Sequence, residues 1–418
     1  MNSTFGESKR PQALVAGVRP VLESRQHATS TVSSFAPLDR PFRSEHHPLP
    51  SLRRKEVGDV RPEPIRLPPI WCPLPLRARS GDRAVQQQSE KFFAAHGFGD
   101  RAMSSAKAMG TGRLACMWAP EGTAEGVQLL SDWLMWALLF DDRYCDAGEV
   151  SRDPTAFGHV ASRMFEAALA VEREGIGDGE FDGFAAALGD IFARIARIGG
   201  AEQALLCSRS QFQWALGAAC GVGDRNGNYL RGLEEHLIAR PMDGADSVSI
   251  HLIEIAEGTW LDSATRLSGP VRAITAAAGL LLTVPTDLAS YGHESRQAAL
   301  ESNVVAILAA DNDCSVQTAV EMAGALLEEV MQLFVDLRER LAADAGPALR
   351  HYLSNLSNMV RGTLEWQRVL PRYACAPEQY ADLASGDVAA EPLHEIAAER
   401  HFTRVEPPAA IRWWWGYV

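Results

Sequence analysis

From about Gln86 to the end of the chain, apolar residues recur at helical spacing almost without interruption. Apolar side chains three and four residues apart fall on one face of a helix, and that face packs against a core. The clearest stripe consists of Leu326, Val330, Leu333, Phe334, Leu337 and Leu341. Similar patterns predict helices at 122–145, 155–172, 180–198, 201–220, 245–257, 270–294 and 346–369. Because the chain has no alternating run of useful length for a β-strand, it is predicted to be all-α.

Glycine and proline clusters separate the predicted helices, and Pro285 is expected to kink the one at 270–294. No cluster interrupts the pattern as a linker would, so a single helical domain is predicted over residues 71–418. Residues 1–70 differ, because they hold ten of the 23 prolines and show no sustained periodicity. A segment of this composition buries too little apolar surface to offset its ordering entropy. We therefore expect a disordered, proline-rich tail there.

The net charge of −13 argues against a general affinity for nucleic acid or for an anionic membrane. An acidic protein still binds an anionic substrate when metal ions lie between the two. The seven cysteines are scattered without metal-binding spacing, so a disulfide framework or zinc site is not expected. The sequence shows no signal-peptide core, and its longest apolar stretch, Ala276–Val284, is too short to cross a bilayer. A cytoplasmic protein without stable membrane insertion is predicted.

The predicted helix at 122–145 is strongly apolar and ends abruptly in acidic residues. Asp142 and Asp146 are four residues apart and should share a helical face, with Asp141 beside them. Carboxylates placed this closely repel one another unless a cation joins them, and oxygen ligands suit Mg²⁺. An acidic helix end that turns into solvent is the alternative. The long apolar run before the cluster favours a carboxylate rim on an apolar cavity.

This cluster resembles the first metal motif of the bacterial class I terpene synthase family, an aspartate-rich sequence after an apolar helix. The second metal motif of that family is similar to residues 286–294, where Thr286, Ser290 and Glu294 line one helical face. Thr286 stands where the family has Asn or Asp, and His293 stands where many members have Lys or Arg. Asp287 points about 100° away around the helix and does not simply substitute for Thr286.

Two further matches keep the same register. The family places an arginine that senses diphosphate a little under fifty residues before the second motif, and Arg240 lies 46 residues before Thr286. An Asp-Gly pair follows that arginine in the family, as Asp243-Gly244 does here. The family also carries an Arg-Tyr pair near the C-terminus, and Arg372-Tyr373 begins 86 residues after Thr286. Four matches in order at these separations are not expected by chance.

The resemblance implies a helical bundle around a central apolar cavity, which would bind three Mg²⁺ ions and an isoprenyl diphosphate. It assigns the metal ions to Asp141, Asp142, Asp146, Thr286, Ser290 and Glu294. It assigns the diphosphate to Arg240, Arg372 and Tyr373. Asp243 and Gly244 would mark the helix break where a backbone carbonyl approaches the ionising allyl group. The implied reaction ionises geranyl, 2-methylgeranyl or farnesyl diphosphate, cyclises the carbocation and releases diphosphate.

Aromatic side chains are the natural wall for such a cation. Six are candidates: Trp118, Trp136, Phe140, Phe212, Trp214 and Trp366. Trp413-Trp414-Trp415 either caps the site or packs on the surface. Within the family, the proline-rich tail and Tyr144-Cys145 are most similar to 2-methylisoborneol-type synthases. A homodimer is common among relatives.

Two other functions fit parts of the pattern. A prenyl diphosphate-binding homologue with impaired catalysis is suggested by Thr286 and His293. A chain-elongating prenyltransferase normally needs two aspartate-rich motifs, and this chain has one. A purely structural helical scaffold would not require the joint spacing of the four motifs.

Overall fold

The computed structural model describes residues 65–169, 180–297 and 299–418, all of which lie in one compact unit spanning 51–418. Helices dominate these residues, so the all-α prediction is confirmed. Most of the predicted N-terminal tail, residues 1–64, lies outside the described residues. The division into a tail over residues 1–70 and a single domain over residues 71–418 stays a prediction.

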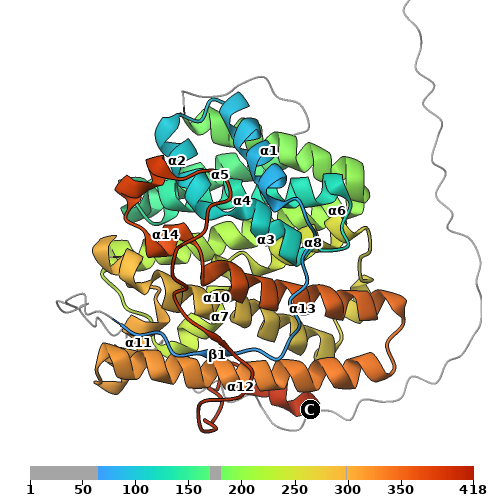
Figure 1. Ribbon diagram of the computed structural model, residues 1–418, viewed down its shortest axis with the longest axis vertical. Coiled ribbons are helices and arrows are strands. Elements are labelled where there is room, and N and C mark those ends of the chain that lie inside the picture. Colours follow the sequence, from blue (N-terminus) through green and yellow to red (C-terminus); the bar gives the residue numbers. More distant parts are fainter. Residues whose placement is uncertain (1–64, 170–179, 298) are drawn as a thin grey trace, which may run out of the picture. The chain divides into compact units, whose positions relative to one another are not determined.

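Four helices open the described chain: α1 (Asp82–Ala95), α2 (Asp100–Met109), α3 (Thr111–Trp118) and α4 (Ala124–Phe140). Thr123 begins α4 by accepting a hydrogen bond from the Gly126 N–H through its side chain, at 3.0 Å. Nearly every side chain of α4 is buried, because α1, α3, α6 and α8 surround it (Figure 1). A helix whose sequence is apolar on every face is expected to be buried on all sides.

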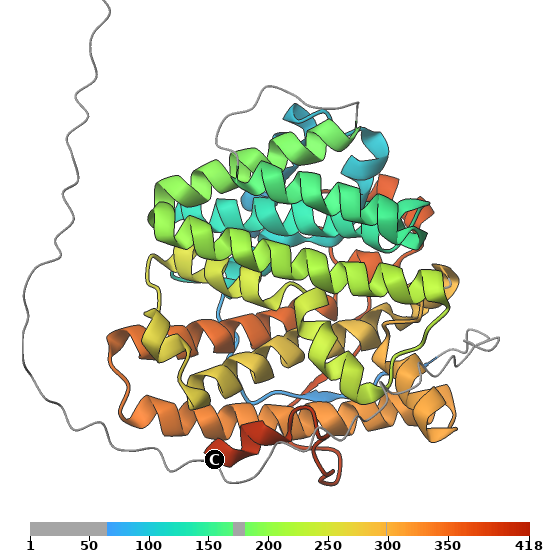
Figure 2. The same cartoon turned by 180° about the vertical axis from the view of Figure 1, so that it is seen from behind.

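The next two helices are α5 (Pro154–Leu169) and the long α6 (Glu180–Gly227), which pack against each other (Figure 2). Gly200 has φ 81° and interrupts α6, where two separate helices were predicted on either side of Gly199-Gly200. The second half runs to residue 227, so the predicted end at 220 was too early. The glycines after residue 220 are tolerated within the last turns of α6.

The remaining helices build the other half of the bundle. They are α7 (Leu233–Asp243), α8 (Asp246–Glu257), α9 (Ser263–Arg266), α10 (Gly269–Gln297), α11 (Val304–Asn312), α12 (Val316–Ala343), α13 (Pro347–Gln367) and α14 (Pro371–Ala374). Helix α10 contacts α7, α12 and α13 and continues through Pro285. By length and hydropathy alone α10 could cross a membrane, yet 83% of its qualifying 18-residue window is buried inside the protein, as in a core helix.

The C-terminal segment crosses the bundle and contributes no wall to the large cavity described below. Its β2 (Ile396–Ala397) pairs in parallel with β1 (Ile70–Trp71). The helical turns η3 (Pro377–Asp382) and η4 (Arg412–Tyr417) follow α14. Trp413-Trp414-Trp415 lies in η4, which packs against α10 and α12 with Trp414 buried. These tryptophans therefore pack on the outside of the bundle and do not cap the cavity.

Candidate active site

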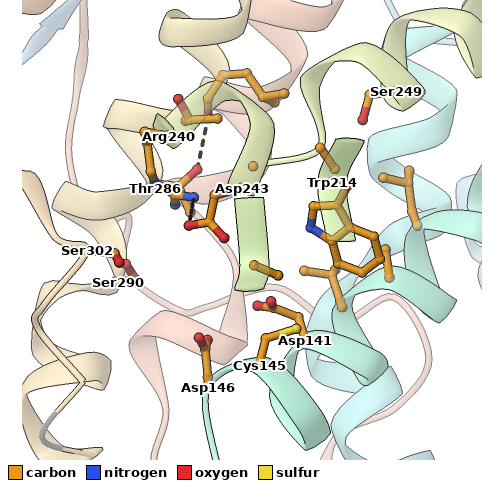
Figure 3. Close-up of a pocket in the computed structure, with 18 of the residues that line it drawn as sticks. Asp141, Cys145, Asp146, Trp214, Arg240, Asp243, Ser249, Thr286, Ser290 and Ser302 are labelled. Atoms are coloured by element: carbon orange, nitrogen blue, oxygen red, sulfur yellow. Dashed lines mark hydrogen bonds and ion pairs between the residues drawn. The ribbon is translucent and has the colours of Figure 1, made fainter. Parts of the chain in front are cut away.

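One cavity lies between α4, α6, α7, α8, α10 and α13, with a polar and an apolar side (Figure 3). The polar side carries Asp141, Asp146, Arg225, Arg240, Asp243, Ser290, Glu294, Arg372 and Tyr373. The apolar side carries Leu114, Trp118, Trp133, Leu134, Leu138, Trp214, Leu282 and Trp366. Such a division suits a ligand with a charged head and a hydrocarbon tail.

The aspartate cluster does not continue α4 as an α-helix. Residues Asp141–Cys145 form a turn of π-helix, η1, in which the Asp146 N–H donates to the Asp141 carbonyl at 2.9 Å. A π-turn brings residues five apart into register, whereas an α-turn aligns residues four apart. The prediction that Asp142 and Asp146 face the cavity together is wrong, because Asp142 is not among the residues that line it. Asp141 and Asp146 are the two that enter the cavity.

The two cavity aspartates lack sufficient positive charge around them. Burial raises the pKa of Asp141 well above its usual value, and the neighbouring charges of Asp146 and Asp243 raise it further. Burial also raises the pKa of Asp146, although Arg225 opposes this effect from 3.9 Å. Asp243 projects from α7 towards Asp141 across the cavity (Figure 3). A bound cation would relieve this crowding of negative charge.

Asp142 lies outside the cavity and forms an ion pair with Arg372 of α14. Arg372 itself lines the cavity, so the pair connects the cavity to the groove beside it, which Asp142 and Arg143 line. The neighbouring Asp142 raises the pKa of the Arg372 guanidinium well above its usual value despite burial. In this structure Asp142 therefore pairs with Arg372, and its role as a metal ligand stays a prediction.

The second motif presents one face of α10 to the cavity, where Thr286, Ser290 and Glu294 all lie. The Thr286 hydroxyl donates to the Leu282 carbonyl at 3.0 Å and also accepts a hydrogen bond from the Gln367 amide. The Ser290 hydroxyl donates to Glu294, whose other carboxylate oxygen accepts from Asn303 at 2.8 Å. Burial, reinforced by the charges of Asp287 and Asp146, raises the pKa of Glu294 to about 8.

This raised pKa predicts how stability depends on pH. The folded state holds the Glu294 proton up to about pH 8, whereas the unfolded chain loses it near pH 4.5. Folding therefore binds a proton between these values, and the free energy of unfolding falls as pH rises through that window. Without divalent cations, we expect melting temperatures to decline from pH 6 to pH 9, and Glu294→Gln to flatten the decline. An equal slope in both proteins would contradict the assignment.

Asp287, which the sequence pattern set aside, is the buried anchor of Arg240, the arginine predicted to sense diphosphate. Its carboxylate accepts from Arg240 Nε at 2.7 Å, from His236 Nε2 at 3.0 Å and from the Val304 N–H at 3.0 Å. Although burial opposes ionisation, Arg240 and His236 hold the pKa of Asp287 below its usual value. Asp287 turns away from the cavity, as its position on the helix predicted. The sequence around Thr286 does not show the role of Asp287, because that role depends on tertiary contacts.

The break between α7 and α8 is fixed by close packing. A Cβ on Gly244 would lie 2.0 Å from Thr283 Cγ2, and a Cβ on Gly217 would lie 2.5 Å from the Asp243 nitrogen. Ala245 takes a left-handed conformation with φ 58°, which an L-residue other than glycine adopts at some cost. Arg240 also contacts Asp243 at 3.3 Å, so an ion pair links the arginine directly to the break. The sequence indicated Asp243-Gly244, but Gly217 was missed.

The predicted aromatic wall is half right. Trp118, Trp214 and Trp366 line the cavity, whereas Trp136 and Phe140 stack on each other in the core and Phe212 is 55% exposed. Trp133, about two turns before the acidic cluster, lines the cavity and was not a candidate. Nearly all of α4 is apolar, so its sequence does not reveal which side faces the cavity.

The oxygen-rich donor set fits Mg²⁺, because buried carboxylates with raised pKa values need added positive charge. Among the described residues, no three His, Cys, Asp or Glu side chains stand close enough to hold an ion by themselves. Ions bound here would need further oxygen ligands from phosphate or water. Mg²⁺ commonly keeps such ligands at phosphate-binding sites.

Comparison with known proteins agrees with this geometry. The family "Terpene synthase family 2, C-terminal metal binding" matches residues 132–333. The chain is 26% identical over 357 residues to (+)-(1(10)E,4E,6S,7R)-germacradien-6-ol synthase of Streptomyces pratensis, covering 84% of this chain and 96% of that protein. It is 25% identical over 315 residues to 4-epi-cubebol synthase ((2E,6E)-farnesyl diphosphate cyclizing) of Streptosporangium roseum, covering 75% and 94%.

A solved structure of the same kind is the SVS_A2 protein from ancestral sequence reconstruction. It superposes with a TM-score of 0.69 at 25% identity, covering 84% of this chain and 98% of that one. The all-helical bundle around an apolar cavity edged by carboxylates and arginines agrees with a terpene cyclase. The chain belongs to the bacterial class I terpene synthase family.

Proposed function

We propose that this enzyme is a Mg²⁺-dependent cyclase that ionises a linear isoprenyl diphosphate and releases diphosphate. The observation that supports it is a single cavity with buried carboxylates and arginines on one side and aromatic rings on the other. Asp141, Asp146, Ser290, Glu294 and Thr286 would hold the metal ions. When bound, Mg²⁺ neutralises charge that develops on the leaving diphosphate.

The protein's own cations would orient the diphosphate. Arg240 and Arg372 are buried, hold their protons and offer forked N–H donors that match phosphate oxygens. Burial raises the pKa of Tyr373 to about 12, so its hydroxyl remains a hydrogen-bond donor. These groups bind the diphosphate at one side, which leaves the hydrocarbon chain against Trp118, Trp214 and Trp366.

The apolar side would fold the chain and exclude bulk water from the carbocation. Aromatic faces stabilise a cation by about 0.5–2 kcal/mol each. The proposed substrates are geranyl, 2-methylgeranyl and farnesyl diphosphate. Farnesyl diphosphate is the substrate in the name of the Streptosporangium relative, whereas 2-methylgeranyl diphosphate follows from the similarity to 2-methylisoborneol-type synthases.

The alternative is a diphosphate-binding homologue with impaired catalysis. Thr286 supplies a single hydroxyl that is already engaged with Leu282 and Gln367. Burial lowers the pKa of His293 to about 4, with Arg372 contributing, so the free protein lacks a permanent cation there. Ser290, Glu294 and both arginines nevertheless remain in place, and these favour an active enzyme.

Incubation with Mg²⁺ and geranyl, 2-methylgeranyl, farnesyl or geranylgeranyl diphosphate tests the proposal. We expect diphosphate release and cyclic products from at least one substrate, loss of both in excess EDTA, and recovery on adding Mg²⁺. No release from any substrate would favour the alternative, and turnover undiminished by EDTA would exclude the metal mechanism. A Thr286→Asn variant that gains strong activity would show that Thr286 impairs the second metal site.

A further inference from the structure

Several hydroxyl and indole groups in the cavity are already satisfied by the protein. The Thr283 and Thr363 hydroxyls donate to the carbonyls of Gly279 and Met359, four residues earlier in their helices, at 3.0 and 2.7 Å. A hydroxyl within a helix commonly makes this bond, which leaves it unavailable to a ligand. Thr363 also accepts from the Trp118 indole at 3.1 Å. These groups therefore add little polarity to the cavity.

The hydroxyl of Ser302, beside Ser290 on the polar side, has no partner among the described residues. On the apolar side the corresponding residue is Ser249. It lies on α8 one turn after Ala245, is 2% exposed, and lines the cavity on the same side as Trp214 (Figure 3). Its backbone N–H donates to the Ala245 carbonyl at 3.1 Å. Among the described residues, however, its hydroxyl has no hydrogen-bond partner. A buried hydroxyl without a partner costs free energy unless water or a ligand binds to it.

A second unpaired donor lies on the same wall. The indole N–H groups of Trp133 and Trp366 donate to Gln211 and to the Met109 carbonyl, at 3.0 and 2.8 Å. The Trp214 indole donates to no residue in the part of the chain that the structure describes. A buried water needs two or more polar partners. On the otherwise apolar side, the Ser249 hydroxyl can donate and accept a hydrogen bond, and the Trp214 indole N–H can donate one.

We infer that Ser249 and Trp214 hold a water molecule that ends the reaction, so that the product is a cyclic alcohol. This inference rests on the proposed cyclase function and adds the class of product. The water oxygen donates a lone pair to the cationic carbon and forms the C–O bond. The resulting protonated alcohol then loses one proton to an oxygen of the released diphosphate. No oxidant or reductant is required.

Product analysis in H₂¹⁸O tests this directly. Wild-type enzyme should give an alcohol that carries ¹⁸O. Ser249→Ala should lower the alcohol-to-hydrocarbon ratio by roughly threefold to tenfold, the factor that one neutral hydrogen bond supports. Trp214→Phe should lower the same ratio while keeping an aromatic ring. Thr283→Val is the matched control, because it removes a cavity hydroxyl that is already bonded, and its ratio should equal that of the wild type.

Several outcomes would overturn the inference. They are a wild-type product that is hydrocarbon only, an alcohol without ¹⁸O, or an unchanged ratio in Ser249→Ala. Failure of every substrate to release diphosphate would instead count against the cyclase function itself. In that case a high-resolution crystal structure decides, since it should show water bonded to Ser249 Oγ in the wild type and no such water in Ser249→Ala. An empty, dry site in the wild type would overturn the inference.

Discussion

Asp141→Ala is expected to lower turnover by about 10²- to 10³-fold or more, the effect of losing a charge-stabilising group at a reaction centre. The fold should survive, because Asp141 makes an unfavourable contribution to the free protein. Burial together with Asp146 and Asp243 raises its pKa, so removing the carboxylate relieves repulsion. The melting temperature should be equal to or above that of the wild type. Diphosphate release and thermal melts on the same preparation measure both effects.

Glu339→Gln is a suitable control, because Glu339 is an exposed acid on α12. It removes the same formal charge and should leave turnover unchanged. Asp142→Asn adds a second comparison, since Asp142 lies outside the cavity and pairs with Arg372. Normal product formation by Asp141→Ala would refute the assigned role, and collapse of its fold would show that the electrostatic argument is wrong.

Asp287→Ala should have the largest effect on stability, about 3–5 kcal/mol, because it leaves the buried Arg240 guanidinium without its main counter-charge. His236 and the Val304 N–H lose the same acceptor. Turnover should also fall, since Arg240 would no longer be held beside Asp243. The pKa of Asp287 is lowered in the folded state, so this stabilisation is present at neutral pH and is lost as pH falls through that lowered pKa.

The matched control is Glu125→Ala, which breaks an ion pair with Arg197 in which both partners are more than half exposed. An exposed pair of this kind contributes about 0–1 kcal/mol. Chemical unfolding of both variants measures the contrast. Similar losses in the two proteins would show that Asp287 is not the buried anchor described above.

Much of this architecture follows from local rules that a sequence contains. The face formed by Thr286, Ser290 and Glu294 requires only helical geometry, and the structure has it. Asp287 shows the limit, because its importance depends on Arg240 and His236, which lie about fifty residues away in the chain. Gly217 shows the same limit, because only packing against α7 explains why a side chain is not tolerated there.

The predictions for the aromatic wall and for the acidic cluster were partly wrong for a different reason. Burial of α4 on all sides removes the amphipathic contrast that would reveal its cavity face, so Trp133 could not be told from Trp136. The α-helical assumption placed Asp142 beside Asp146. The structure instead winds that segment more widely.

That wider winding has a consequence for how aspartate-rich sequences of this kind tolerate change in length. A helix that accepts one surplus residue as a bulge keeps its flanking carboxylates aligned without building a loop. Here the surplus residue falls between Asp141 and Asp146, five positions apart. Deleting one residue between them would restore ordinary winding and a separation of four. The spacing of the aspartates in such a sequence is thus matched to the winding of the helix. Aspartates four residues apart on an α-helix, or five apart across a π-turn, can both place two carboxylates in one cavity.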